Sequence, residues 1–148
     1  MNVDKVWGRP IMVVEDDFLI GELLVLRLEM AGYRVTWARD GAAALNMIDR
    51  AKPELLVLDL GLPVLDGFQV LERLRARPLW SQLPILVLTA RQCEDDVRRA
   101  VRLGATDYMA KPFNDFVLIK RIARHLCGAA IDPKPPEVAA PREVWFVD

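Results

Sequence analysis

The sequence predicts a doubly wound α/β fold, in which helices cover both faces of a parallel β-sheet. Short apolar runs alternate with longer segments of helical periodicity five times along the chain, and this alternation is typical of successive βα units. Three of the apolar runs have no polar interruption, as expected for strands that are buried on both faces. With 148 residues and a hydrophobic content of 53%, the chain can fill one core of ordinary size. We therefore expect a single domain with a C-terminal tail.

The five units follow one another in order. The expected strands are Ile11 to Val14, Tyr33 to Ala38, Leu55 to Asp59, Ile85 to Thr89 and Ala105 to Met109. The expected helices are Phe18 to Ala31, Gly41 to Ala51, Gly67 to Ala76, Asp95 to Leu103 and Phe116 to Leu126. Each strand therefore leads into a helix, which is the connection that neighbouring parallel strands need.

The residues of each strand indicate its place in the sheet. Three runs, Ile11 to Val14, Leu55 to Leu58 and Ile85 to Leu88, are continuously apolar, so the first, third and fourth strands should be central. In the second strand, Tyr33, Val35 and Trp37 alternate with Arg34 and Thr36, which is the period-two pattern of a strand with one face partly wet. We expect this strand at an edge of the sheet.

The helices show start signals and a core stripe. Leu118, Ile122 and Leu126 recur at four-residue spacing and predict the buried face of the last helix. Asn114 is its expected N-cap, and Asp17 is the expected starting residue of the first helix. These signals agree with the division into five units.

Residues 9–127 hold all of these elements, and the character of the sequence changes after about residue 128. Four of the ten prolines lie within nine residues, which predicts a stiff linker. The linker leads to the apolar run Val144 to Val147 near the end of the sequence. We expect residues 128–148 to be either a linker and the entry strand of an output domain or a tail that docks on this domain or on a partner.

Composition argues against several classes of protein. The formal net charge of −1 does not favour binding to nucleic acid through bulk electrostatics. Cys93 and Cys127 are too few and too far apart for a disulfide framework or a zinc site. The sequence has no signal-peptide core and no apolar stretch that could span a bilayer. We expect a soluble, cytoplasmic protein that does not contact a membrane.

Residues that carry chemistry follow four of the expected strands. Asp59 ends the third strand, Thr89 ends the fourth and Lys111 follows the fifth, while three acidic residues, 15–17, follow the first. Functional groups of an open parallel sheet gather beyond the carboxyl ends of its strands. We therefore expect these side chains to share one edge of the sheet.

The charges at this edge predict a metal ion and a phosphoryl group. Two ionised carboxylates about 4 Å apart repel by roughly 4 kcal/mol at an effective dielectric constant near 20, so they need a cation. Oxygen ligands without His or Cys favour Mg²⁺, for which Mn²⁺ could substitute. Lys111 and Thr89 supply a positive charge and a hydroxyl donor for phosphoryl oxygens during in-line transfer. Asp59 would be the nucleophile that forms an acyl phosphate.

Each of these residues, taken singly, also has a structural interpretation. Asp16 and Asp17 are typical of helix starts, where acids are favourable. Asp59 could be a turn acid, Thr89 a β-branched strand residue and Lys111 a solvated loop charge. Only their convergence at one edge favours the functional interpretation.

Four motifs at these positions resemble those of a known family. They are Val14 Glu15 Asp16 Asp17; Leu58 Asp59 Leu60 Gly61 Leu62 Pro63 with Asp66 Gly67; Leu88 Thr89 Ala90; and Asp107 Tyr108 Met109 Ala110 Lys111 Pro112 Phe113. From about Arg9 to Cys127, the chain resembles the receiver domain of bacterial two-component response regulators. The resemblance implies a flavodoxin-like (βα)5 fold with strand order 2-1-3-4-5. It also implies phosphorelay signalling, in which a sensor histidine kinase or a histidine phosphotransfer protein donates a phosphoryl group and the receiver switches conformation.

The resemblance implies a Mg²⁺-dependent phosphoacceptor site. Asp59 takes the phosphoryl group, and Asp16 and Asp59 bind the metal together with the main-chain carbonyl of Gly61. Glu15 reaches the ion through water, and Lys111 holds a phosphoryl oxygen.

The resemblance also implies the residues of a conformational switch. Thr89 and Tyr108 correspond to the family's switch pair, and Pro112 to its cis-proline, which aims the neighbouring lysine into the site. Gly61 and Arg91 line the mouth of the site and influence the lifetime of the phosphoryl group.

Two surfaces are candidate partner sites. Phe18 and Val25 on the first helix lie close to its polar side, near the place where relatives dock their histidine donor. The last two helices form the surface through which many relatives form a homodimer after phosphorylation. Here that surface would include Asp107, Arg121 and the basic face of the preceding helix at Arg98, Arg99 and Arg102, which could also be an ordinary solvated face.

Two other functions are alternatives. An aspartyl-phosphate hydrolase of the haloacid dehalogenase type typically carries a second acid two residues after its nucleophile, but Gly61 occupies that position. This favours a switch that catalyses only its own phosphorylation and dephosphorylation over a turnover enzyme. The chain could also be the N-terminal part of a winged-helix DNA-binding transcription regulator. DNA would then be bound only by an output domain beyond these residues.

Overall fold

The computed structural model describes residues 7–91 and 93–127, which form five βα units. The strands are β1 (Pro10–Val14), β2 (Arg34–Ala38), β3 (Leu55–Leu58), β4 (Ile85–Thr89) and β5 (Asp107–Ala110). The helices are α1 (Phe18–Met30), α2 (Gly41–Ala51), α3 (Gly67–Arg75), α4 (Glu94–Arg102) and α5 (Asp115–Cys127), with a 3₁₀ helix, η2 (Pro78–Trp80). The expected linker and the apolar run of residues 128–148 lie outside the described residues.

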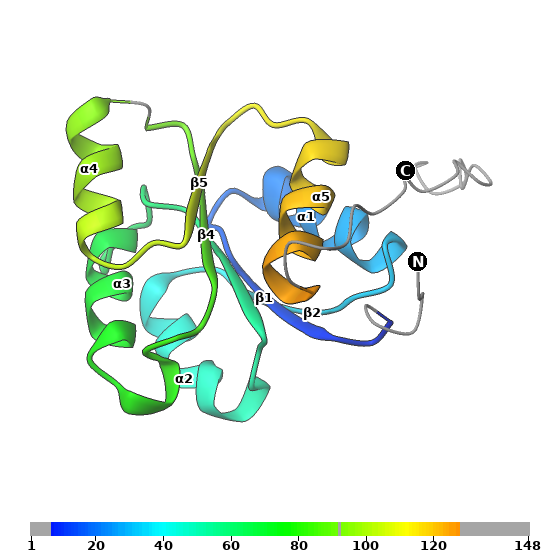
Figure 1. Cartoon of the computed structure of the whole chain (residues 1–148), viewed down its shortest axis with the longest axis horizontal. Helices are drawn as coiled ribbons and strands as arrows, with labels where there is room; N and C mark the ends of the chain where they lie inside the picture. Colours follow the sequence, from blue (N-terminus) through cyan, green and yellow to red (C-terminus); the bar gives the residue numbers. More distant parts are fainter. Residues whose placement is uncertain (1–6, 92, 128–148) are drawn as a thin grey trace.

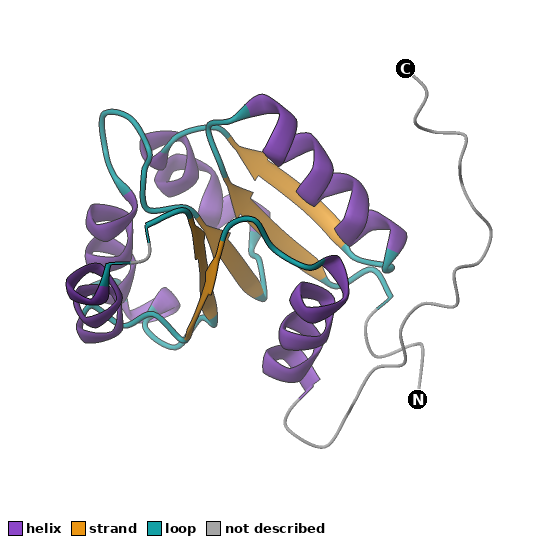
Figure 2. Cartoon of the chain, turned by 90° about the horizontal axis from the view of Figure 1, so that it is seen from above, coloured by secondary structure: helices purple, strands orange, loops and turns teal. Residues whose placement is uncertain are grey.

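The sheet has the predicted order, β2-β1-β3-β4-β5, and all of its strand pairs are parallel. The prediction that β2 is an edge strand is therefore confirmed, as is the central position of β1, β3 and β4. Helices α1 and α5 cover one face of the sheet, while α2, α3 and α4 cover the other (Figures 1 and 2). The chain is thus a three-layer, doubly wound α/β fold.

Alternation along the central strands produces two hydrophobic cores. The side chains of Ile11, Val13, Leu55 and Val57 pack with α1 and α5, whereas those of Met12, Val14, Leu56 and Leu58 pack with α2 and α3. Successive residues of a strand face opposite sides of a sheet. A strand covered on both sides therefore has to be apolar throughout, which explains the three uninterrupted runs in the sequence.

Side chains cap the helices that follow β1 and β5, as predicted. The Ile20 N–H donates to Asp17 Oδ1 at 3.0 Å, and the Val117 N–H donates to Asn114 Oδ1 at 3.1 Å. Each carboxylate or amide satisfies a main-chain donor that has no partner within its helix. Asp17 is therefore held at the start of α1, directly beside the acidic residues that precede it.

The fifth strand begins two residues later than predicted. Gly104, with φ +106°, ends the turn after α4, and the Ala105 N–H still donates to the Ala100 carbonyl. The Thr106 hydroxyl accepts from the Ile85 N–H at 3.0 Å, so this residue serves the neighbouring strand before β5 begins. Sequence periodicity did not reveal this turn because its residues are mostly apolar.

Trp80 is buried in the short helix η2. Its indole N–H donates to Asp49 Oδ1 on α2 at 2.8 Å. This hydrogen bond lies in the layer of α2 and α3, on the face of the sheet opposite to α1 and α5.

Candidate functional site

The register of the sheet brings the first two motifs together. Val14 and Leu58 are partners in the ladder between β1 and β3, so the residues that follow them, Glu15 and Asp59, leave the sheet side by side. The Asp59 N–H donates to the Val14 carbonyl at 3.1 Å. Glu15 and Asp59 are both buried, with exposures of 1% and 8%.

Three carboxylates converge at this point. Glu15, Asp16 and Asp59 each offer an oxygen, and the three oxygens lie within 4.8 Å of one another. Asp16 is exposed, so the cluster is open to solvent on one side. A set of close oxygen donors with no nitrogen or sulfur ligand fits a hard divalent cation that keeps some of its water.

Gly61 lies at the open mouth of this cluster. Its N–H donates to Asp59 Oδ1 at 3.3 Å. A side chain at position 61 would meet only Asp59 Oδ2, at 3.9 Å. A Cβ atom at position 61 would therefore be accommodated beside Asp59 without a clash.

Lys111 enters the site from the segment after β5. Its ammonium group forms an ion pair with Glu15 and lies 3.3 Å from Asp59 Oδ2. The Lys111 N–H donates to the Thr89 carbonyl at 2.9 Å, and the Lys111–Pro112 peptide bond is cis, the isomer that the resemblance implies. One positive charge thus lies between two buried carboxylates.

Burial and the ion pairs shift the pKa values of this group. Burial raises the pKa of Glu15, the hydrogen bond from Lys111 opposes that rise, and the charge of Asp59 adds to it. Burial alone would lower the pKa of Lys111, but the hydrogen bond to Glu15 and the charge of Asp59 outweigh it, so the pKa is raised. Lys111 is therefore protonated at neutral pH and balances part of the negative charge.

The predicted switch residues meet at the segment after β4. Thr89 is buried at the end of β4, and its hydroxyl accepts from the Arg91 N–H at 3.3 Å. The Tyr108 hydroxyl on β5 donates to the Arg91 carbonyl, and burial raises the pKa of this phenol. Thr89 and Tyr108 are therefore linked through the main chain of one residue.

The side chain of Arg91 contacts helices α3 and α4. Its guanidinium carbon is 5.9 Å from the centre of the Phe68 ring, and Nη1 is 3.8 Å from Asp96 Oδ2 on α4. The structure thus brings Glu15, Asp16, Asp59 and Lys111 into one cluster, with the Gly61 N–H donating to Asp59. Thr89 is joined to this cluster through the Lys111 main chain, and Thr89 and Tyr108 both bind the main chain of Arg91.

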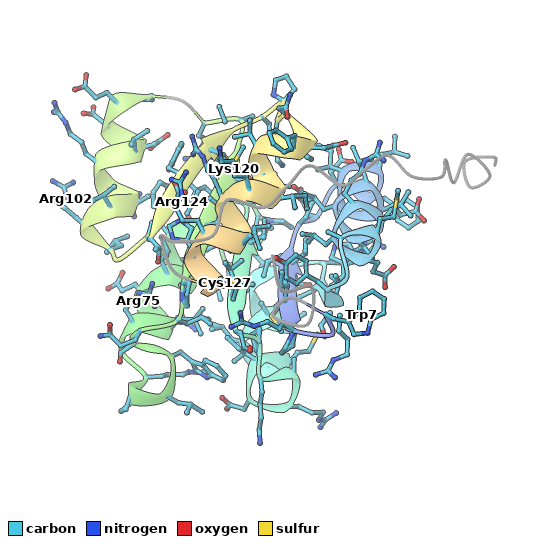
Figure 3. The ribbon with its side chains drawn as sticks, turned by 45° about the vertical axis from the view of Figure 1, so that its right-hand side comes forward. Trp7, Arg75, Arg102, Lys120, Arg124 and Cys127 are labelled. Carbon is cyan, nitrogen blue, oxygen red and sulfur yellow. The ribbon has the colours of Figure 1, made fainter. Side chains whose placement is uncertain are left out.

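Residues of the expected surface on the last two helices have contacts within the chain. Arg121 Nη1 lies 3.3 Å from Asp107 Oδ1, and the exposed Arg99 lies over the Phe68 ring at 4.1 Å. Arg102 projects outward from α4 (Figure 3). Sequence reasoning missed His125, whose Nε2 lies 2.9 Å from Asp107 Oδ2. Its four-residue spacing from Arg121 on α5 is the signal that could have identified it.

The exposed apolar surface of α1 is centred differently from the expectation. Phe18 is 50% exposed as expected, but Val25 is only half-buried rather than prominent. Leu19, which the sequence analysis did not single out, is 76% exposed. The most exposed apolar residues of α1 therefore lie at its start, next to the acidic residues, while Leu23 and Met30 are exposed to a smaller extent.

Fold and site together define a doubly wound α/β protein with a cluster of carboxylates and a lysine at the carboxyl edge of its sheet. The chain belongs to the response regulator receiver domain family, whose model matches residues 11–123. It is the receiver domain of a two-component response regulator, a signalling switch. Receiver domains interact with histidine kinases and bind Mg²⁺ in an acidic pocket.

Three of the individual proteins that the chain resembles are a transcriptional regulatory protein and two receiver domains. The alkaline phosphatase synthesis transcriptional regulatory protein PhoP of Bacillus subtilis is 41% identical over 134 residues, which are 90% of this chain and 52% of PhoP. The chain thus spans about half the length of this relative. The non-phosphorylated HemR receiver domain of Leptospira biflexa is 35% identical with a TM-score of 0.74, over 86% of this chain and 99% of that one.

A third relative was solved with a metal ion. The receiver domain of sensor histidine kinase PA1611 from Pseudomonas aeruginosa, with magnesium coordinated in its active site cleft, is 33% identical. Its TM-score is 0.74, over 82% of this chain and 99% of that one. In residues 7–91 and 93–127 of the present chain, no helix is long and apolar enough to cross a membrane.

Proposed function

We propose that Asp59 is the phosphoacceptor of this receiver and takes its phosphoryl group from a phosphohistidine. The donor would be a sensor histidine kinase or a histidine phosphotransfer protein. The observation that carries the proposal is the position of Asp59, between two further carboxylates within 4.8 Å and the Lys111 ammonium 3.3 Å away. A nucleophile placed between a cation site and a fixed positive charge suits transfer of a negatively charged group.

The proposed step is an in-line displacement at phosphorus. A carboxylate oxygen of Asp59 forms a bond to phosphorus while the P–N bond to the histidine breaks, and the electron pair stays on the imidazole nitrogen. Lys111 and the Thr89 hydroxyl bind phosphoryl oxygens as the charge on them shifts. The chain would catalyse only this reaction and the later hydrolysis of its own acyl phosphate, since Gly61 stands where a hydrolase would carry a second acid.

Mg²⁺ would occupy the cluster of acidic side chains, and Mn²⁺ could substitute for it. Asp16, Asp59 and the Gly61 carbonyl would bind the ion directly, and Glu15 would bind it through water. When bound, the ion neutralises charge on the phosphoryl oxygens. The magnesium in the active site cleft of the Pseudomonas relative supports this assignment.

We expect Mg²⁺ to raise the thermal stability of this protein, and the Asp16→Asn variant to lose most of that gain. The ion binds the folded state and offsets repulsion within the cluster. At ten times its Kd, the free energy of unfolding should therefore rise by about 1.4 kcal/mol. The measurement is the unfolding midpoint as a function of MgCl₂ concentration.

The Asp17→Asn variant is the matched control for this prediction. Asp17 is the adjacent acid, but it caps α1 instead of joining the cluster, and Asn is an equally good N-cap. This variant should retain the full response to Mg²⁺. Equal loss of the stabilisation by Mg²⁺ in both variants would mean that the ion stabilises the protein only through the net charge of this region.

We propose that Thr89 and Tyr108 form the switch, and that Arg91 limits access of water to the phosphoryl group. The Arg91→Ala variant should still be phosphorylated but should lose its phosphoryl group faster, by roughly threefold, which is under 1 kcal/mol of barrier. The measurement is the decay of phosphoprotein after the donor is removed. Arg98→Ala, which removes an exposed arginine paired with Glu94, is the control, and equal decay in all three proteins would contradict the assignment.

The second candidate function is that of a receiver domain within a longer regulatory protein. The Bacillus subtilis relative is a transcriptional regulatory protein of which this chain covers 52%. We propose that residues 9–127 are the receiver and that residues 128–148 lead into an output domain that would bind DNA. Homodimerisation through α4 and α5 after phosphorylation would then bring two output domains together. The reading frame that follows Asp148 tests directly whether residues 128–148 lead into an output domain.

A further inference from the structure

Trp37, on the edge strand β2, contacts the first residue of the acidic loop, which we define as residues 15–17, and the residue directly after that loop. Its indole N–H donates to the main-chain carbonyl of Glu15 at 2.9 Å. Its ring centre lies 5.7 Å from that of Phe18, the first residue of α1. One side chain therefore reaches the residue that opens the loop and the residue that follows it.

The hydrogen bond at Glu15 controls the direction of the chain into Asp16. The Glu15 carbonyl belongs to the peptide unit that joins these two residues, and that unit is planar. The Glu15 N–H already donates to the Ala38 carbonyl of β2 at 3.1 Å. With the indole bound to the carbonyl, both polar main-chain groups of Glu15 are held by β2.

Helix α1 leaves space for the indole at one position. A Cβ atom at Gly21 would lie 2.0 Å from Cζ2 of Trp37, so only glycine permits this approach. The Gly21 N–H donates to the Asp17 carbonyl at 2.8 Å. The turn of α1 that leaves space for the indole is therefore hydrogen-bonded to the last residue of the acidic loop. Any larger residue at position 21 would push the indole away from Glu15.

Arg39 covers the outer side of this arrangement. Its guanidinium carbon lies 5.3 Å from the centre of the Phe18 ring and 5.5 Å from that of Trp37. Such cation–π contacts restrict both rings. The indole of Trp37 is thus held by its hydrogen bond to Glu15, by close packing on Gly21 and by the guanidinium group of Arg39.

We propose that Trp37 is a positioning residue for the metal site, in which its indole N–H fixes the Glu15–Asp16 peptide and so sets the affinity for Mg²⁺. The inference rests on the proposed function, because it assumes that Asp16 and Glu15 serve the ion. Outer hydrogen-bond partners of metal ligands typically contribute about 10- to 100-fold in affinity. Trp37 acts through the main chain, so we expect the lower end, about tenfold.

The test compares Mg²⁺ binding by the Trp37→Phe and Trp80→Phe variants of the full chain. Trp80 is the matched control because its indole also donates one hydrogen bond, at 2.8 Å, but to Asp49 on the opposite layer. Both exchanges remove an indole and should lower the unfolding midpoint. Only Trp37→Phe should also raise the Kd for MgCl₂, measured from the dependence of the midpoint on ion concentration.

The indole N–H signals in a ¹⁵N–¹H NMR spectrum give a second readout in the unaltered protein. The Trp37 and Trp80 signals are assigned by their disappearance in the two variants. The Trp37 signal should move during a MgCl₂ titration and the Trp80 signal should not. Replacing Trp37 by benzothienylalanine, which keeps the ring shape without the N–H, should weaken Mg²⁺ binding as Trp37→Phe does, even if the phenylalanine variant folds poorly.

The outcomes separate this inference from the proposed function. A Kd within twofold of the unaltered protein in both Trp37 variants would overturn the role of Trp37, although the metal site would stand. Equal weakening by Trp80→Phe would also overturn it, because the effect would then be a general loss of stability. An unaltered protein that does not bind Mg²⁺ would overturn the metal site itself, and the inference with it.

Discussion

The Asp59→Asn variant should take up no phosphoryl group from acetyl phosphate or phosphoramidate in the presence of Mg²⁺. The unaltered protein should take up one per chain. The amide has nearly the shape of the carboxylate but lacks the negative charge and nucleophilicity that the reaction needs. Intact-protein mass spectrometry at successive times measures the rate of uptake. We expect the rate for the variant to be less than a hundredth of that for the unaltered protein, which is equivalent to more than about 2.7 kcal/mol of barrier.

The Asp66→Asn variant is the control for this exchange. Asp66 caps α3 in the segment that follows Asp59, with its side chain accepting from the Gln69 N–H, and asparagine is an equally good cap. Phosphoryl uptake should therefore be retained. Uptake by the Asp59→Asn variant at the rate of the unaltered protein would show that another residue is the acceptor.

The largest expected loss of stability comes from Gly67→Ala, directly behind the phosphoacceptor. A Cβ atom at Gly67 would lie 2.3 Å from the main-chain oxygen of Asp59 and 2.5 Å from Cα of Leu60. These neighbours are main-chain atoms and cannot rotate away. We expect a loss of about 3 kcal/mol, at the upper end for overpacking, and a fall of roughly 10 °C in Tm for a domain of this size.

Gly61→Ala, in the loop between β3 and α3, is the matched control for this loss. A Cβ atom there would meet only Asp59 Oδ2, at 3.9 Å, which is ordinary van der Waals contact. Thermal unfolding should show nearly unchanged stability for this variant. Equal losses at positions 61 and 67 would contradict this explanation, because the close approach of α3 to the main chain of Asp59 and Leu60 exists only at Gly67.

Much of the fold was predictable because burial leaves a periodic record in the sequence. Strands β1, β3 and β4 are apolar at every position except Thr89, the last residue of β4, since both of their faces are covered. The side-chain caps at Asp17 and Asn114 were predictable because they are local. The start of β5 was not predictable, because the conformations of Gly104 and Thr106 depend on contacts with distant residues. No local pattern in the sequence shows those contacts.

The candidate site was largely predictable for a related reason. Its residues follow the ends of parallel strands, and strand order alone brings such ends together. Trp37 could not be identified in this way, because it looked like one residue of an alternating edge strand. Its role depends on an indole reaching Glu15 and on a glycine on another element, and neither contact has a signature in sequence. The packing of Arg99 on Phe68 was missed for the same reason.

The most direct test of the account is to locate the phosphoryl group in the unaltered protein. After incubation with Mg²⁺ and phosphoramidate, reduction with borohydride converts an aspartyl phosphate into homoserine, and tandem mass spectrometry of the peptides identifies its position. The account predicts homoserine at position 59 and nowhere else. Homoserine at Asp16 or any other acidic residue, or its absence from the phosphorylated protein, would contradict it.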